Sequence, residues 1–317
     1  MIGAVWDRKV SQRQRADGHS AAGRDDQHFA GSGALVASAP KEDRHFIDQP
    51  DVEHSKEIAS PVIGVLGSKG GVGATTVAVN LGASFALAGG ASARTTLIDA
   101  NFQQPDAALI LSKDPVNTLS DLIQRSEHMS RQMFDACCYE VSSGQKSFAV
   151  ISPPFSGEAA VQFNLSMLAA CMQSIGSYSD LWVVDLPKVL DRHLVTMLDL
   201  CSAIVLVVEP NLTSIAAAKR WLDSFDDLGY AREGIVIAVN RSGGKVRHVE
   251  EHLHNAFQSR PLVKVPNVYA QAEECAITGQ PLVMKHPRDA YAKSIAAIAA
   301  TIDRFIKTTG HRLSDDR

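Results

Sequence analysis

The stretch that decides the fold is "VIGVLGSKGGVGATTVAVNLGASFALA", residues 62 to 88. An apolar run from Val62 to Gly67 is followed by a glycine-rich turn and then by an apolar segment with a helical period. This order predicts a buried strand, a tight loop and a helix that ends at Gly89 and Gly90. Glycines let backbone N–H groups turn inward around an anion, and the N-terminus of the next helix adds a positive dipole. The loop therefore predicts a phosphate-binding site.

The composition is that of a globular α/β protein. The chain has 317 residues, of which 45% are hydrophobic and 6% aromatic, and a net charge of -4 at pH 7. The aliphatic-rich composition favours helices packed on a parallel sheet over a β-sandwich. Its near-neutral charge gives no general attraction to nucleic acid or anionic lipid. The five cysteines lack a Cys-x-x-Cys spacing and are expected to be buried thiols. With no signal peptide and no apolar run of about 20 residues, the chain is expected to be cytoplasmic.

The chain divides into two parts of different character. Residues 1–57 are polar, of mixed charge and without a sustained period, so we expect a disordered extension. Residues 58–317 are expected to form one α/β domain. Seven continuous apolar runs predict buried parallel strands: "VIGVLG", "TTLIDA", "FAVIS", "LWVVDL", "AIVLVVE", "GIVIAVN" and "LVKVP". Helices are expected between them, at roughly 158–176, 213–227, 246–257 and 289–306, besides the one after the loop.

Two acidic residues follow later apolar runs, Asp99 in "TLIDAN" and Asp185 in "LWVVDLP". Parallel sheets place their ligand chemistry at the carboxyl ends of the strands. Thr75 falls in the loop where a hydroxyl would coordinate Mg²⁺, and an acid at a strand end can hold the metal through water. The three residues together predict a magnesium–nucleotide site, with Thr75 and Asp185 as its metal residues.

With these residues in place, the sequence resembles the MinD/ParA family of P-loop ATPases. "KGGVGATT", Lys69 to Thr76, is similar to the family's deviant Walker A motif, in which a lysine opens the loop. The resemblance runs from about residue 61 to 305, with the motifs in the right order. It implies a mostly parallel twisted sheet with helices on both faces, and ATP and Mg²⁺ as ligands.

The resemblance also implies roles for the matched residues. Lys69 would reach across a homodimer, with ATP sandwiched at the interface, to the partner's phosphates. Asp99 matches the switch I aspartate and Asp185 the Walker B aspartate. "VNRSGG" and "VPNVYAQAEECAITGQPLV" resemble the segments near adenine. The implied catalytic residues are Lys69, Asp99 and Asn101, and the implied nucleotide-binding residues are Lys69, Gly70, Gly71, Val72, Gly73, Ala74, Thr75, Thr76, Asn240, Arg241 and Pro266.

Two positions depart from the family pattern. Ala74 replaces the lysine that grips the β- and γ-phosphates, and one lost charge-assisted contact costs about 1.5–3 kcal/mol of binding. Asn101 replaces the second acid of an Asp-x-Asp pair, so it can orient a water but cannot accept its proton. Loss of one preorganised donor commonly lowers a rate by about 10²–10³. The hypothesis is an ATP-binding, dimerising regulatory ATPase with slow hydrolysis; a pseudo-ATPase scaffold that needs no hydrolysis is the alternative.

Within that family, "DANFQQPDAALIL" followed by "DPVNTLSDLI" looks most like the CpaE/TadZ branch. This likeness implies a localisation or assembly factor for Flp (Tad) pili, with pilus or secretion assembly proteins as partners, recruited to a cell pole or an inner-membrane assembly site. Many members of the branch carry a receiver-like domain before the ATPase, and the extension here is too short and too hydrophilic to be one. A DNA-partitioning or division-site ATPase remains a further alternative.

The C-terminal segment carries several lysines and arginines, together with the amphipathic stretch "SIAAIAATIDRFIK". The positive excess is small and has no interleaved aromatics, so we expect an ordinary solvated surface and no nucleic-acid partner. The apolar side of the stretch is mostly Ala and Ile. We expect this helix to pack on the sheet, and any contact with a membrane to be indirect.

Overall fold

The computed structural model describes residues 58, 60–89, 93–243, 247–257, 260–310 and 313. All of them fall within one compact unit, Glu53–Arg317. The predicted N-terminal extension, residues 1–57, lies outside the described residues.

The described residues form a single eight-stranded sheet in the order β3-β4-β2-β5-β1-β6-β7-β8. All neighbouring strands are parallel except β3, which is antiparallel to β4 at the edge. The strands are β1 (Val62–Gly67), β2 (Thr95–Asp99), β3 (Tyr139–Ser143), β4 (Lys146–Ile151), β5 (Leu181–Leu186), β6 (Ala203–Val208), β7 (Ile235–Ser242) and β8 (Leu262–Pro266). The mostly parallel twisted sheet expected from the continuous apolar runs is confirmed.

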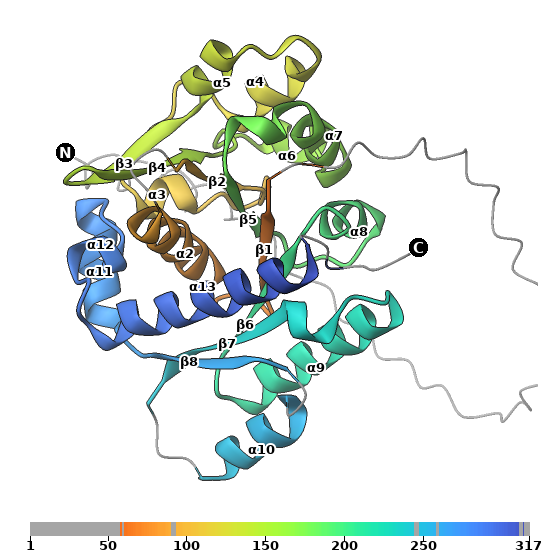
Figure 1. Ribbon diagram of the computed structural model, residues 1–317, viewed down its shortest axis with the longest axis vertical. Helices are drawn as coiled ribbons and strands as arrows, with labels where there is room; N and C mark the ends of the chain where they lie inside the picture. The colour runs from red at the N-terminus through yellow and green to blue at the C-terminus, as the bar shows by residue number, and fades with distance from the viewer. Residues whose placement is uncertain are drawn as a thin grey trace, which may run out of the picture. The chain divides into compact units, whose positions relative to one another are not determined.

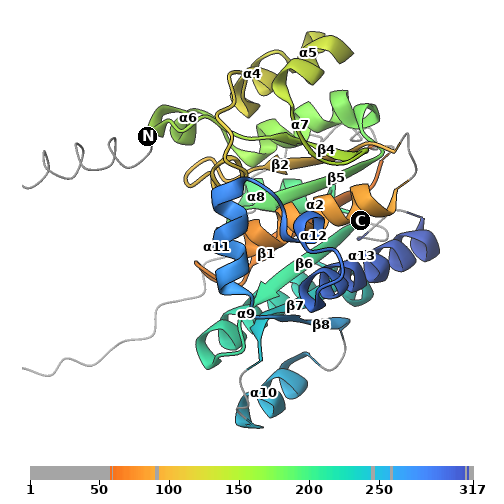
Figure 2. The ribbon, with the colours of Figure 1, turned by 90° about the vertical axis from the view of Figure 1, so that its left-hand side faces the viewer.

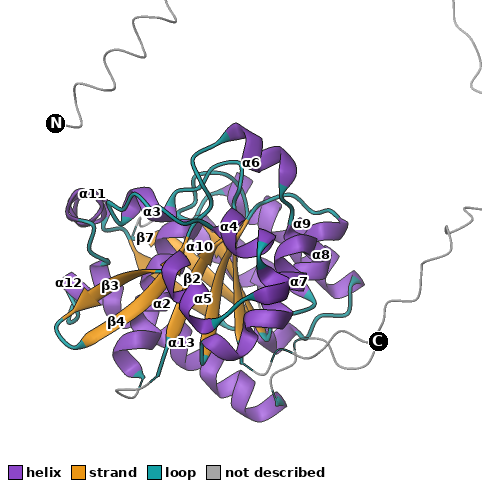
Figure 3. Ribbon diagram, turned by 90° about the horizontal axis from the view of Figure 1, so that it is seen from above, coloured by secondary structure: helices purple, strands orange, loops and turns teal. Residues whose placement is uncertain are grey.

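Helices cover both faces of this sheet (Figures 1 and 3). They are α2 (Ala74–Ala88), α3 (Ala107–Ile110), α4 (Leu119–Gln124), α5 (Arg131–Cys137), α6 (Gly157–Gln162), α7 (Leu165–Ile175), α8 (Arg192–Leu198), α9 (Leu212–Asp227), α10 (Arg247–Phe257), α11 (Tyr269–Thr278), α12 (Leu282–Lys285) and α13 (Ala290–Thr309), with 3₁₀ turns at Ser126–His128, Gly176–Tyr178 and Arg232–Gly234. One buried cluster joins the sheet to α2, α12 and α13, and a second joins the opposite face to α4, α5, α7, α8, α9 and α10.

Strand β1 lies at the centre of the sheet, hydrogen-bonded to β5 on one side and to β6 on the other. Successive side chains of a strand point to opposite faces. Ile63 and Val65 accordingly join the cluster under α2, whereas Val62 and Leu66 join the opposite one. Because both faces are covered, every residue of the strand is buried. The loop that follows β1 therefore starts from the most constrained part of the fold.

Helix α13 packs against α2 and β8, as expected for the amphipathic C-terminal stretch. Its apolar face, which includes Ile295, Ile298 and Ile302, is fully buried. Two of the C-terminal cations form ion pairs, Lys285 with Glu274 and Lys307 with Asp303. Among the described residues, no helix combines the length and the apolar character that a bilayer span requires.

Two expectations about individual elements are wrong. The predicted helix at 158–176 is two helices, because Asn164 leaves the helical conformation and its side chain accepts from the N–H groups of Ser166 and Met167 at the start of α7. Strand β3 was not predicted, since in "YEVSS" only Val141 is buried and the apolar run is absent. This strand pairs with β4 through a turn at Gly144, whose positive φ of 62° suits glycine.

Candidate functional site

The loop between β1 and α2 has the backbone of an anion-binding turn. Gly71 and Gly73 have φ of 78° and 85°, a region that side chains rarely adopt. Helix α2 begins at Ala74, directly after Gly73, and no side chain caps it. The N–H groups of its first turn therefore have neither an intrahelical partner nor a side-chain cap, which leaves them available to an anion. The predicted loop residues therefore lie between β1 and the first turn of α2.

Asn240, at the end of β7, fastens this loop to the sheet. Its side-chain amide is buried and donates to the carbonyl of Val72 at 2.8 Å. A Cβ built on Gly73 would lie 2.6 Å from the same amide nitrogen. The amide of the predicted adenine-contacting asparagine therefore also holds the loop in position.

We expect Gly73→Ala to destabilise the protein by about 1–3 kcal/mol. Alanine is strained at the left-handed φ of this position, and its Cβ would break the hydrogen bond from Asn240 to the Val72 carbonyl. Gly70 is a matched control, since it lacks a positive φ and a Cβ there meets nothing within 4 Å. Thermal unfolding of the nucleotide-free proteins measures the effect. Equal melting temperatures for Gly73→Ala and Gly70→Ala would contradict this account of the loop.

Two buried carboxylates lie side by side under the loop. Asp99 ends β2 and is paired in register with Asp185 of β5, and both are almost fully inaccessible to solvent. The hydroxyl of Thr75, in the first turn of α2, donates to Asp185. The three residues predicted from strand ends and loop spacing are therefore brought together.

The electrostatics of this pair favour a cation. Burial raises the pKa of Asp99 from 3.8 to about 7, although the N–H groups of Ala107 and Asn101 lower it. Burial, and then the negative charge of Asp99, raise the pKa of Asp185 well above its ordinary value, while the Thr75 hydrogen bond and the charge of Lys188 lower it. Oxygen ligands of this kind suit Mg²⁺, which usually keeps several waters and binds substrate phosphates as well. The residues present therefore fit the ion that the loop motif implies.

Asn101 begins a loop that Asp99 organises. The two carboxylate oxygens of Asp99 accept from the N–H groups of Asn101 and Ala107, both at 3.0 Å. The side chain of Asn101 accepts from the N–H of Gln104 at 3.3 Å and lines a cavity of about 330 Å³. The cavity opens beside the carboxyl ends of β2 and β5, and its wall includes Pro187, which follows β5. Asn101 thus lies beside the acid pair, where a water could be held.

Lys69, the lysine that opens the loop, is held by Glu209. Its ammonium nitrogen lies 3.5 Å from a carboxylate oxygen of Glu209, the residue that follows β6. The guanidinium of Arg241 binds the same carboxylate. Lys69 therefore points toward the β6–β7 side of the site in its own chain, away from the Asp99–Asp185 pair on the β2–β5 side.

The residues predicted to lie near adenine meet at the carboxyl ends of β7 and β8. Asn240 and Arg241 are in β7, and Pro266 ends β8 opposite Ser242. Arg241 has a positive φ of 56°, which interrupts the regular register between the two strands. The structure thus brings this group together on the β7–β8 side of the loop.

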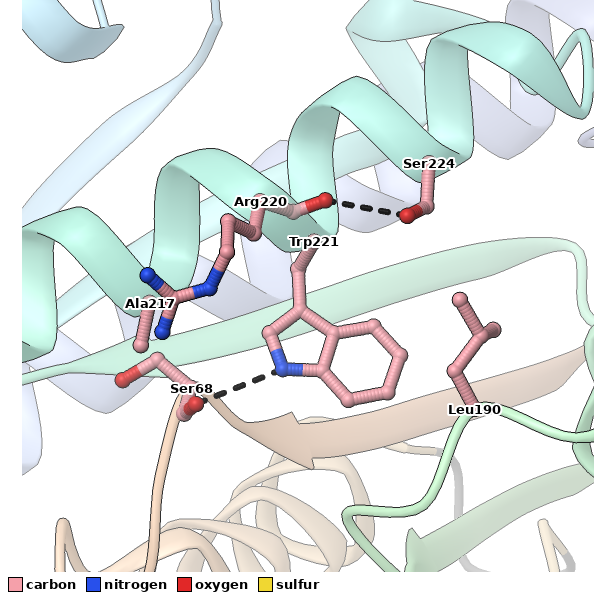
Figure 4. A pocket seen from close by; sticks show the side chains of 6 residues that line it. All are labelled: Ser68, Leu190, Ala217, Arg220, Trp221 and Ser224. Atoms are coloured by element: carbon pink, nitrogen blue, oxygen red, sulfur yellow. Dashed lines mark hydrogen bonds between the residues drawn. The ribbon is translucent and has the colours of Figure 1, made fainter. Parts of the chain in front are cut away.

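Helix α9 supports the start of the loop from the opposite face of the sheet. The indole N–H of Trp221 donates to the carbonyl of Ser68 at 3.3 Å, and Leu190 lies across from the indole ring (Figure 4). The hydroxyls of Ser68 and Ser214 are 2.9 Å apart. Ser68, Trp221 and Leu190 line a small cavity of about 180 Å³. The loop is therefore fixed at Ser68 by α9 and at Val72 by Asn240.

Two charged residues of the site were not predicted from the sequence. Glu209 comes directly after the apolar run "AIVLVV", and Lys188 follows Asp185 by three residues in "DLPKVL". A search for charges just beyond every predicted parallel strand would have found both, because such strands end at one edge of the sheet. Lys188 brings positive charge to a site whose loop lacks a lysine at Ala74.

No family model matches the chain. It is 22% identical over 242 residues to an uncharacterised ATP-binding protein of Methanocaldococcus jannaschii, a match that covers 76% of this chain and 86% of that protein. A ParA family ATPase of Chlorobium tepidum is similar in structure, with a TM-score of 0.68, 22% identity and coverage of 76% of this chain and 99% of that one. The septum site-determining protein MinD of Pyrococcus horikoshii, complexed with Mg-ADP, has a TM-score of 0.63 at 19% identity and covers 78% and 98%. The chain therefore has the fold of the ParA and MinD P-loop ATPases.

Proposed function

We propose that this chain binds Mg-ATP at the loop after β1 and dimerises across the carboxyl edge of its sheet. One observation carries the proposal: the Thr75 hydroxyl donates to Asp185 beside a second buried carboxylate, Asp99, at the N-terminus of an uncapped helix. A buried pair of acids is costly without a cation. An uncapped helix start favours an anion. A magnesium–phosphate group satisfies both requirements at once.

Each residue then has a part in holding the nucleotide. The N–H groups from Gly70 to Thr76 surround the phosphates, and Thr75 and Asp185 hold the metal, directly or through water. Bound Mg-ATP supplies a terminal phosphate that can be transferred to water. Asn101 orients that water but cannot take its proton, and Ala74 offers no charge to the phosphates. Hydrolysis is therefore slow.

Exposed apolar side chains around the site support a dimer. Six of them follow the carboxyl ends of β4, β5, β6 and β8, and so lie along one edge of the sheet: Phe155, Val161, Val189, Leu190, Leu212 and Tyr269. The elements α6 and α11, which carry two of them, lie at this same edge in Figure 2. Exposed apolar surface of this kind, next to a nucleotide site, is typical of a face that another molecule covers. A second copy that covers it would bring its Lys69 to the phosphates of the first.

Molar mass measured by light scattering, at several protein concentrations, tests the proposal. We expect a monomer without nucleotide and a dimer with Mg-ATP. Lys69→Ala should weaken the dimer at least tenfold, because it removes a charge-assisted contact to phosphate. Lys293→Ala is the control, since Lys293 is exposed on α13. A mass that does not respond to Mg-ATP, whether monomer or fixed dimer, would contradict the proposal.

In the cell, the proposed role is that of a localisation or assembly factor for Flp (Tad) pili. The support is the sequence likeness of residues 99–123 to the CpaE/TadZ branch. The ATP-bound dimer would gather pilus assembly proteins at a pole or at the inner membrane, with membrane contact through those partners. A fluorescent fusion that forms polar foci with wild-type loop residues, and is diffuse with Lys69→Ala, is the expected result. Salt-dependent DNA binding would instead favour a partitioning ATPase, and ATP-dependent liposome binding a division-site one.

Ala74 favours one second candidate, a scaffold that binds ATP and does not hydrolyse it. Both candidates predict the dimer, and they differ in turnover. Phosphate release measured with purified dimer at saturating Mg-ATP separates them: a slow rate above the buffer background indicates an ATPase, and a rate equal to the background indicates a scaffold.

A further inference from the structure

A single carboxylate holds two cations of the candidate site. Glu209 contacts the ammonium of Lys69 at 3.5 Å and also binds the guanidinium of Arg241. Lys69 opens the phosphate loop, and Arg241 lies at the carboxyl end of β7. Glu209 therefore connects the phosphate side of the site to the side where the base is expected.

The backbone and neighbouring side chains fix Glu209 in place. Its N–H donates to the hydroxyl of Ser214 at 2.8 Å, and the amide of Asn211 donates to its carboxylate at 2.9 Å. Its side chain is only 14% exposed, compared with 36% for Lys69 and 43% for Arg241. A carboxylate that is largely withdrawn from water requires positive partners. Glu209 is thus the least exposed member of the group and is held by further hydrogen bonds, whereas the two cations are partly exposed.

We propose that Glu209 is a positioning residue that holds Lys69 against its own chain until a phosphate displaces it. This inference rests on the proposed function, in which Lys69 must extend to the phosphates of a partner copy. Because that phosphate belongs to another chain, Lys69 has to turn away from its own Glu209 to reach it. The contact in the free chain therefore opposes dimer formation, and Mg-ATP on the partner overcomes it.

The second cation makes this contact reversible. If Lys69 were the sole partner of Glu209, its departure would leave a nearly buried carboxylate uncompensated, at a large cost. Because Arg241 stays, Lys69 can leave at the modest cost of a partly exposed ion pair. The pair Lys69–Glu209 is therefore strong enough to bias the loop and weak enough to be displaced.

The test compares Mg-ATP-dependent dimerisation of the wild-type chain with that of Glu209→Gln, which keeps the shape and loses the charge. We expect the dimer dissociation constant of the variant to be about five-fold lower, the upper end for a partly exposed ion pair. In a Lys69→Ala background the same substitution should change nothing, because Glu209 acts through Lys69. The role would be overturned if Glu209→Gln dimerised no more tightly than the wild type. It would also be overturned if the substitution tightened the dimer equally in the Lys69→Ala background.

Chemical acetylation of the nucleotide-free chain tests the ion pair between Lys69 and Glu209 directly. We expect the Lys69 amine to react several-fold faster in Glu209→Gln than in the wild type, relative to Lys293 in the same sample by mass spectrometry. An unchanged ratio would mean that Glu209 does not hold Lys69. A wild-type chain that stays monomeric with Mg-ATP would overturn the proposed function and this role with it. If the wild-type chain dimerises with Mg-ATP and Glu209→Gln has the same dimer dissociation constant, the role of Glu209 alone is overturned.

Discussion

Replacing Ala74 by lysine should convert this chain into a faster ATPase that binds ATP more tightly. The substitution places an ammonium at the first position of α2, next to the loop N–H groups that would surround the phosphates. One charge-assisted contact contributes about 1.5–3 kcal/mol, which is roughly 10- to 150-fold in affinity. A donor that meets the charge of the transition state should raise the turnover rate by about 10²–10³.

The gain should be specific to the charge. Ala74→Met has a side chain of similar length without the ammonium, so it controls for packing against Gly67, whose added Cβ would lie 3.3 Å from the Ala74 Cβ. We expect Ala74→Met to bind ATP no more tightly than the wild type. The nucleotide-free Ala74→Lys chain should be slightly less stable, because a cation at a helix N-terminus is unfavourable by about 0.3–1 kcal/mol.

Isothermal titration with ATP and steady-state phosphate release are the two measurements. If Ala74→Lys gains affinity without turnover, Asn101 limits the chemistry, and adding Asn101→Asp should then raise the rate further. If it gains neither over Ala74→Met, the loop does not present phosphate to position 74, and a MinD-like arrangement of the nucleotide is wrong.

The central part of the fold could be predicted because its signals are local. A strand, a glycine turn and a helix from Val62 to Ala88 are specified by residues that are neighbours in the chain. The acids Asp99 and Asp185 each end an apolar strand, and parallel strands bring their ends to one edge. That the two lie side by side depends on β2 being next to β5, which the sequence pattern does not reveal.

Contacts between distant segments were beyond the sequence pattern. Glu209 meets Lys69 because β6 lies next to β1, and Arg241 joins them because β7 follows β6. A carboxylate after a strand has many ordinary uses, such as capping a helix, so its identity alone does not indicate an ion pair. Asn240 similarly serves the loop through Val72, a contact set by strand order rather than by a motif.

The nucleotide-free protein should lose stability as the pH rises from about 5 to 8, in the presence of a metal chelator. Asp99 has a pKa of about 7 in the fold against 3.8 as its ordinary value, and the Asp185 pKa is raised well above the same value. The folded chain therefore binds protons that the unfolded chain has already released, so its stability is full below about pH 4 and falls as the pH passes through the folded pKa values. At about 1.4 kcal/mol per pKa unit, the shift of Asp99 alone lowers the free energy of unfolding by roughly 4 kcal/mol between about pH 4 and pH 7, of which roughly 3 kcal/mol falls above pH 5.

The variant Asp185→Asn distinguishes two effects of the acid pair: how much it destabilises the protein without metal, and how much it contributes to binding Mg-ATP. Asparagine keeps an oxygen that can accept from Thr75 and does not repel Asp99. We expect the nucleotide-free variant to melt higher than the wild type at pH 8 and to vary less with pH, because it lacks the buried Asp185 carboxylate. The exposed Asp114→Asn is the matched control and should leave both quantities unchanged.

Mg-ATP should reverse this order. A ligand that binds only the folded state raises the melting temperature according to its affinity. The wild type should therefore gain stability with Mg-ATP at pH 8. Asp185→Asn should gain little, since it lacks the carboxylate that is proposed to hold the metal. A substitution that stabilises the empty protein and removes the response to ligand is expected only where the buried acids exist to hold a cation. Thermal unfolding of both chains, with and without Mg-ATP, at pH 5 and pH 8, measures whether the order of their melting temperatures reverses. If Asp185→Asn is less stable than the wild type without nucleotide, the acid pair stabilises the fold by itself, and the argument for a cation between Asp99 and Asp185 fails.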